Sequence, residues 1–210
     1  MERDEEAIAR WVEHDWARIK RRAARTGAHL VFIDETGFLL HPLVRRTWAP
    51  RGQTPVLRQR TCHRRRVSGI GGLTISPRRR RLGWYLRLHV DASIRQEQVL
   101  DFLRHLLRHL DGPLVVVWDR LQAHRSRALS QWRRRCRRIH VESLPGYAPE
   151  LNPNEYGWAY LKGHPLANYC PSDAEELHAR VVVAARDAAS QQALLRSFVH
   201  ATGLPIRLGH

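Results

Sequence analysis

Hydrophobic periodicity predicts an amphipathic helix followed by a buried strand in the first part of the chain. From about Glu5 to Arg25, apolar residues recur at helical spacing: Ile8, Trp11, Val12, Trp16 and Ile19. Gly27 marks the end of this helix. The next run, HLVFID (29–34), is apolar and rich in β-forming residues, which favours a buried strand that carries Asp34 at its end.

Two further strands and a helix are predicted after an intervening loop. The segment TWAPRGQTPVL (47–57) has the Pro and Gly residues that are typical of a loop. Strands are predicted at 66–75 and 82–90, joined by a turn around Pro77, and together with the first strand they would form an antiparallel meander. A helix is predicted at 95–110, with an apolar face formed by Val99, Leu103, Leu106, Leu107 and Leu110.

The second half of the chain alternates between strands and helices. The apolar run GPLVVVWD predicts a strand that ends at Asp119. A helix at about 126–135, a strand at 137–144 and a helix containing Glu155 follow. Three meander strands followed by this alternation predict an α/β fold with a mixed five-stranded sheet and flanking helices, the arrangement of ribonuclease H-like folds. Asp34 and Asp119 would then lie at neighbouring strand ends.

The composition indicates a globular protein that binds nucleic acid. At 210 residues with 43% hydrophobic residues, the chain can bury one substantial core. Its 36 basic and 20 acidic residues give a net charge of +16, the sign expected for a partner with phosphate groups. Most of the charge is arginine, and three arginine clusters indicate a binding surface, although a charge run is often only a solvated face. The candidate DNA-binding residues are Arg64, Arg65, Arg66, Arg78, Arg79, Arg80, His124, Arg133, Arg134, Arg135 and Lys162.

The remaining signals exclude several classes of protein. The three cysteines, Cys62, Cys136 and Cys170, form no C-x-x-C pair, which argues against a zinc site and a disulfide scaffold. The N-terminus is charged where a signal peptide would be apolar, and no apolar run approaches the roughly 18 residues of a membrane span. We therefore expect a cytoplasmic protein with no membrane partner.

Three acidic residues are the candidates for chemistry: Asp34, Asp119 and Glu155. Hard divalent cations prefer carboxylate oxygens, so carboxylates gathered from separate elements indicate metal-dependent phosphoryl transfer. Each also has a structural interpretation. Asp34 could cap a turn with Thr36, and Glu155 could be the third residue of a helix capped by Asn152. Asp119 closes an apolar strand, where a buried carboxylate is costly unless it is paired or metal-bound, so function is favoured there.

The motifs together resemble the catalytic domain of a DDE (Asp-Asp-Glu) transposase from bacterial insertion sequences of the mariner-like superfamily. The resemblance rests on IDETGF, on TWAPRGQTP, on His124 five residues after Asp119, and on LPGYAPELNPNEYGW. It covers about 31–162 and implies a ribonuclease H-like DDE catalytic domain at 29–165, preceded by an amphipathic helix at 1–28 and followed by a helical extension at 166–210. Arg120 and Tyr156 depart from the residues that the family commonly has beside its second and third carboxylates.

The resemblance also implies a mechanism and partners. Two Mg²⁺ ions, for which Mn²⁺ can substitute, would be held by Asp34, Asp119 and Glu155 and would support strand cleavage and strand transfer at transposon ends. The expected partners are transposon-end and target DNA, further copies of the chain, and a separate N-terminal DNA-binding polypeptide, because full-length relatives carry such modules ahead of the catalytic domain. A bacterial, nucleoid-associated location would follow.

Two other functions stay open at this point. The chain could be a non-enzymatic DNA-binding remnant of a transposase, an interpretation against which the presence of all three carboxylates weighs. It could also be a ribonuclease H-like nuclease acting on host nucleic acid, against which the LNPNEYGW and TWAPRGQTP motifs weigh. His124 has two interpretations of its own, as a phosphate contact or as a cap of the following helix.

Overall fold

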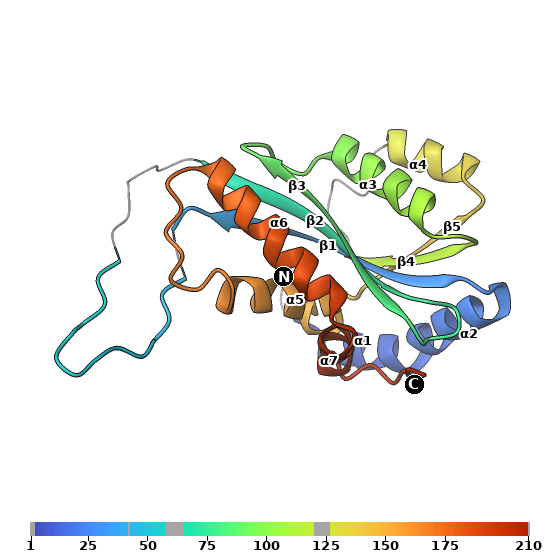
Figure 1. Ribbon diagram of the computed structural model, residues 1–210. Coiled ribbons are helices and arrows are strands. Elements are labelled where there is room, and N and C mark those ends of the chain that lie inside the picture. The colour runs from blue at the N-terminus through green and yellow to red at the C-terminus, as the bar shows by residue number, and fades with distance from the viewer. Residues whose placement is uncertain (1–2, 42, 58–64, 120–126, 210) are drawn as a thin grey trace.

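A computed structural model describes residues 3–41, 43–57, 65–119 and 127–209, and it confirms the predicted mixed sheet (Figure 1). The sheet has the strand order β3-β2-β1-β4-β5, in which β1 pairs in parallel with β4, β4 pairs in parallel with β5, and the other pairs are antiparallel. The strands are β1 (His29–Leu39), β2 (Arg66–Ile75), β3 (Leu82–Val90), β4 (Leu114–Trp118) and β5 (Ile139–Ser143).

Strand β1 is longer than the sequence predicted, so the expectation that it ends at Asp34 was wrong. It continues to Leu39, which lies opposite Arg66 of β2. Pairing with β4, in contrast, reaches only Phe32, opposite Val117. The antiparallel partner β2 supplies backbone partners to the residues after Asp34, which the sequence alone suggested were a turn. Asp34 therefore lies inside a strand, just beyond the point where β1 loses its β4 neighbour.

The N-terminal helix is present with one local difference. It consists of α1 (Glu5–Arg10), a π-helical turn η1 (Trp11–Asp15) and α2 (Trp16–Thr26), and Gly27 ends it with a left-handed φ of 61°. In a regular α-helix, residues five apart point about 140° apart. The π turn, in which the N–H of Trp16 donates to the carbonyl of Trp11, brings both indoles into the core with stacked rings 6.1 Å apart.

Helices cover both faces of the sheet. On one face lie α3 (Gln96–His109) and α4 (Arg127–Arg135), close to their predicted bounds. The other face is covered by α2 and by α5 (Pro153–Gly163), α6 (Ala174–Ser190) and α7 (Gln192–Ala201), with the short 3-10 turn η3 (Pro149–Leu151) ahead of α5 (Figure 1). The helices α6 and α7 thus share one hydrophobic core with the N-terminal helix.

The segment that carries the TWAPRGQTP motif projects away from the body of the protein (Figure 1). Residues 43–57 contain neither helix nor strand beyond an isolated bridge at Leu43, as the Pro and Gly residues predicted. Trp48 in this segment is fully exposed. Elsewhere, Cys136 and Cys170 have free thiols, whereas Cys62 lies outside the described residues. Among the helices that the structure describes, none combines the length and the apolar character needed to cross a membrane.

A buried carboxylate on β5 links the N-terminal helix to the sheet and should make stability depend on pH. Glu142 accepts hydrogen bonds from Arg18 (2.6 and 2.8 Å) and lies 2.7 Å from His140 Nε2. Burial tends to raise the pKa of Glu142, but the hydrogen bonds from Arg18 and His140 outweigh it and lower the pKa below its ordinary value. A lowered carboxyl pKa stabilises the fold above the pKa of the unfolded state, and this stabilisation is lost as the pH falls through the folded value.

We predict that Glu142→Gln lowers the free energy of unfolding by about 2 kcal/mol near pH 7, the cost of a lost hydrogen bond to a charged group. The difference in free energy of unfolding between this variant and the wild type should disappear as the pH falls below about 4.3. Urea unfolding at a series of acidic pH values measures this difference, and Glu97→Gln, at an exposed position of α3, is the control. A difference that does not change with pH would contradict the prediction.

Candidate active site

The register of the sheet places the first two candidate carboxylates side by side. Phe32 of β1 lies opposite Val117 of β4 in a parallel pair. Asp34 and Asp119 each lie two residues further along the chain, Asp34 still inside β1 and Asp119 directly after β4, so both follow the last paired residues of these two strands. In open α/β sheets this is the edge at which ligands bind. The predicted placement at neighbouring strand ends is therefore correct for Asp119 and wrong for Asp34, which lies inside β1.

The third carboxylate is delivered by the first turn of α5. Asn152 caps this helix as the sequence predicted: its side chain accepts the N–H of Asn154 at 3.2 Å. Pro153 is the first helical residue, and the N–H of Glu155 donates to the carbonyl of Asn152 at 3.1 Å. The amide of Asn152 also donates to the carbonyl of Ile33, the residue before Asp34, at 3.1 Å.

Asn154 makes the second hydrogen bond between α5 and β1, after that of Asn152. It is fully buried, and its amide nitrogen donates to the carbonyl of Phe32 at 2.7 Å. Its side-chain oxygen accepts the indole N–H of Trp84 from β3 at 2.9 Å. Neither contact was predicted from the sequence. The signal was the second Asn in LNPNEYGW, an amide at an inward-facing position of a helix that otherwise buries apolar residues.

Trp158 connects α5 to Asp34 directly. Its indole Nε1 donates to Asp34 Oδ2 at 3.0 Å, and the ring is buried against Trp84 and Phe38 with ring centroids 5.3 and 6.1 Å away. Gly71, opposite Asp34 on β2, leaves room for this indole, because a Cβ at that position would lie 2.5 Å from the ring. Trp158 therefore packs against the sheet beside Asp34.

Glu155 and Asp119 lie close enough to Asp34 to affect its ionisation. Burial and, after it, the negative charge of Glu155 raise the pKa of Asp34 to about 7; Asp119 adds a smaller effect, while hydrogen bonds from the Glu35 backbone and Trp158 oppose the rise. Burial also raises the pKa of Glu155; Lys162 opposes this and Asp119 adds to it. Two strands and a helix therefore bring the three acidic groups into one electrostatic neighbourhood.

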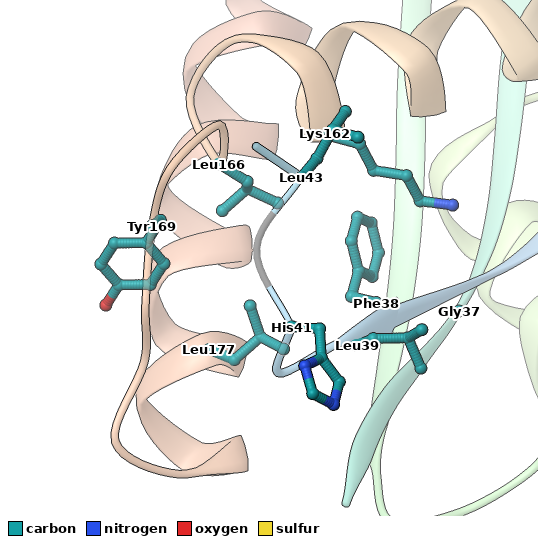
Figure 2. Close-up of a pocket in the computed structure, with 9 residues that line it drawn as sticks. All are labelled: Gly37, Phe38, Leu39, His41, Leu43, Lys162, Leu166, Tyr169 and Leu177. Carbon is teal, nitrogen blue, oxygen red and sulfur yellow. The ribbon is translucent and has the colours of Figure 1, made fainter. Parts of the chain in front are cut away.

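Lys162, two helical turns after Glu155 on α5, adds a basic group to this site. Its Nζ donates to Thr36 Oγ1 at 2.7 Å and lies 5.6 Å from the ring centroid of Phe38. Burial lowers the pKa of Lys162, while Glu155 and Asp34 act in the opposite direction. Lys162 also lines a cavity of about 270 Å³ between the end of β1 and the start of α6, together with apolar residues that Figure 2 labels.

The carboxylates do not form a closed set of metal ligands. Within the ranges that the structure describes, no three His, Cys, Asp or Glu side chains are grouped so that they could hold a metal ion. The donor chemistry nevertheless suits a hard cation, because all three groups are carboxylates and Asp34 is desolvated beside two like charges. A divalent cation is the species that would relieve this repulsion.

The predicted DNA-binding residues are spread over both ends of the sheet. Arg66 begins β2 beside the end of β1 and donates to Ser93. Arg65, the residue before it, is ion-paired with Asp91 and Glu175 at 2.7 Å each. The turn with Arg78, Arg79 and Arg80 follows Ile75, which pairs with Leu30, so it lies at the opposite end from Asp34. Arg134 and Arg135 end α4, just before β5 begins at that same opposite end. Arg64 and His124 lie outside the described residues, as does the side chain of Arg133.

Most of the chain matches one known protein family. Residues 29–178 match the family described as DDE superfamily endonuclease. The chain belongs to this family. No curated protein matches it in sequence.

Solved structures with a similar fold include several of Mos1 transposase. The paired-end complex with the left transposon end has a TM-score of 0.64 at 19% identity, over 96% of this chain and 60% of that one. The catalytic domain of Mos1 mariner transposase has a TM-score of 0.54 at 16% identity, over 99% of this chain and 98% of that one. This likeness confirms the predicted ribonuclease H-like DDE fold. The chain spans about 60% of the length of the Mos1 chain in the paired-end complex.

Because Asn154 holds α5 against β1, we predict that Asn154→Ala destabilises the protein strongly. The substitution leaves the carbonyl of Phe32 and the indole N–H of Trp84 without their present partners inside the core. At about 1–3 kcal/mol for each of these two unsatisfied buried groups, the loss should total about 2–6 kcal/mol. Urea unfolding measures this loss of stability. A loss below about 1 kcal/mol would show that the hydrogen bonds of Asn154 do not hold α5 against β1.

Proposed function

We propose that the chain is the catalytic domain of a transposase that cleaves DNA strands and transfers them at the ends of a mobile element. One observation carries the proposal: the register of β1 and β4 brings Asp34 and Asp119 side by side, and Asn152 bonds the helix that carries Glu155 to the residue before Asp34. Membership of the DDE superfamily endonucleases and a net charge of +16 support it.

We propose that Asp34, Asp119 and Glu155 hold two divalent cations, Mg²⁺ or Mn²⁺. When bound, these ions supply Lewis-acid activation of the nucleophile and stabilisation of the leaving oxygen of the DNA strand. The chain's own residues provide the setting. Trp158 and the Glu35 backbone hold Asp34 in place by hydrogen bonds, and the first turn of α5 holds Glu155. Lys162 carries a positive charge beside the carboxylates, where it can bind a DNA phosphate.

The finer parts of the proposal concern the biological setting. We infer that the element is a bacterial insertion sequence, that its end DNA and target DNA are the partners, and that the active form contains more than one copy of the chain. A separate N-terminal DNA-binding polypeptide would recognise the ends. DNA as the partner is supported by the similar Mos1 transposase structure, which is a paired-end complex with the left transposon end. Such a protein would work inside the cell, at the nucleoid.

The carboxylate substitution Asp119→Asn tests the chemistry. It keeps the side-chain shape but removes the charge that would hold a cation, so we expect at least a hundredfold loss of Mg²⁺-dependent strand cleavage with DNA binding and folding intact. The assay measures nicking of end DNA with the end-recognition module fused or co-expressed.

Asp101→Asn is the matched control, because that carboxylate is exposed on α3 and lies 3.5 Å from Arg104, away from the three carboxylates. It should cleave at the wild-type rate. Wild-type cleavage by Asp119→Asn would remove Asp119 from the mechanism. A wild type that stays inert beside its recognition partner would favour the non-enzymatic DNA-binding remnant.

The arginine clusters predict DNA binding that weakens steeply with salt. Each neutralised phosphate contributes about −0.9 to the slope of log affinity against log salt concentration. If the cluster at the end of α4 contacts DNA, the triple variant Arg133→Ala, Arg134→Ala, Arg135→Ala should make the slope shallower by about 2–3. Fluorescence anisotropy with labelled duplex measures it.

A second triple variant controls for net charge alone. Arg10, Arg21 and Arg25 are exposed on α1 and α2, and replacing all three by Ala removes the same charge from another surface. Equal slopes for the two triple variants would mean that the α4 cluster is only a solvated face.

A further inference from the structure

We propose that Trp158 is a positioning residue for metal binding: its indole N–H fixes the orientation of the Asp34 carboxylate and thereby couples that ligand to Glu155. The inference rests on the proposed function, because it assumes that Asp34 is a metal ligand. It adds a role that the three-carboxylate motif does not contain, carried by a residue that does not itself ligate a metal.

The hydrogen bond is the first support. Trp158 Nε1 lies 3.0 Å from Asp34 Oδ2, and an indole nitrogen can only donate. Because the indole is buried, its N–H cannot hydrogen-bond to solvent in place of Asp34, and losing this acceptor would cost free energy. The bond therefore restrains both partners: it satisfies the buried indole and selects the orientation of the Asp34 side chain.

The packing around the indole makes this restraint rigid. Trp84 and Phe38 lie against the ring from β3 and β1. Gly71 lets the ring approach β2, since a Cβ there would lie 2.5 Å from Cη2 and 2.6 Å from Cζ2 of Trp158. An indole packed on three sides cannot rotate, so the Asp34 side chain adopts the orientation in which its carboxylate accepts the indole N–H.

The position of Trp158 in the sequence couples two ligands. It lies three residues after Glu155 on α5, a helix fastened to β1 through Asn152 and Asn154. The same rigid element thus presents the Glu155 carboxylate and the donor that orients Asp34. Groups that orient metal ligands typically change metal affinity by about 10–100-fold when they are removed.

The test is the Mn²⁺ affinity of the DNA-free protein, measured by isothermal titration calorimetry. Trp158→Phe keeps an aromatic ring but removes the N–H, and we expect it to weaken Mn²⁺ binding by about tenfold or more. In cleavage assays, the Mn²⁺ concentration for half-maximal rate should rise by a similar factor while the rate at saturating Mn²⁺ largely recovers. A purely structural role would not produce this split.

Trp11→Phe is the matched control. It removes the N–H of another buried indole, which donates to the carbonyl of Ser143 at 2.9 Å, and it leaves Asp34 and the residues packed around Trp158 unchanged. We expect a comparable loss of thermal stability but Mn²⁺ affinity within about twofold of wild type. If Trp158→Phe does not fold, benzothienylalanine inserted at position 158 keeps the shape of the indole and replaces the N–H by sulfur, and the same loss of affinity is expected.

The outcomes separate this inference from the proposed function. Wild-type Mn²⁺ affinity in the position-158 variants, with Asp119→Asn still abolishing Mn²⁺ binding, overturns the positioning role alone. Equal losses of Mn²⁺ affinity in the Trp158 and Trp11 variants would show that the affinity follows stability alone, which also overturns the positioning role. A wild-type protein that binds no Mn²⁺ overturns the inference and the metal-dependent function together.

Discussion

The attachment of α5 to β1 is the constraint on which the candidate site depends. The amides of Asn152 and Asn154 donate to the carbonyls of Ile33 and Phe32, at the point where β1 loses its pairing with β4. Buried backbone carbonyls beside the end of a neighbouring strand need a hydrogen-bond donor from elsewhere in the protein, and these two side chains supply it. The same bonds bring the first turn of a helix, and with it Glu155, to the strand that carries Asp34.

This attachment explains why the surrounding positions accept few residue types. Gly71 must lack a side chain because the indole of Trp158 occupies that space. Gly157 is similarly close to Trp84, where a Cβ would lie 2.6 Å from the ring. The result is a desolvated edge of the sheet at which negative charges gather and Lys162 supplies one positive charge. Tight packing and unfavourable electrostatics meet here, which is typical of functional sites.

The sequence predicted the features that depend on local pattern. The bounds of β2 and β3 were correct, because the turn at Pro77 and the four arginines after it separate the two strands clearly in the sequence. Features that depend on distant residues could not be predicted. The extension of β1 beyond Asp34 requires β2 as a partner, and the pairing of Arg65 with Asp91 and Glu175 joins segments far apart in the chain.

The most direct test of the proposed site is a crystal structure of the protein soaked with Mn²⁺, with anomalous scattering recorded at the manganese edge. We expect the anomalous peaks to lie between Asp34, Asp119 and Glu155, with the indole of Trp158 still hydrogen-bonded to Asp34. Peaks elsewhere on the protein, or a Glu155 side chain that stays turned away from a metal bound by the two aspartates, would contradict the proposal that these three carboxylates form one metal centre.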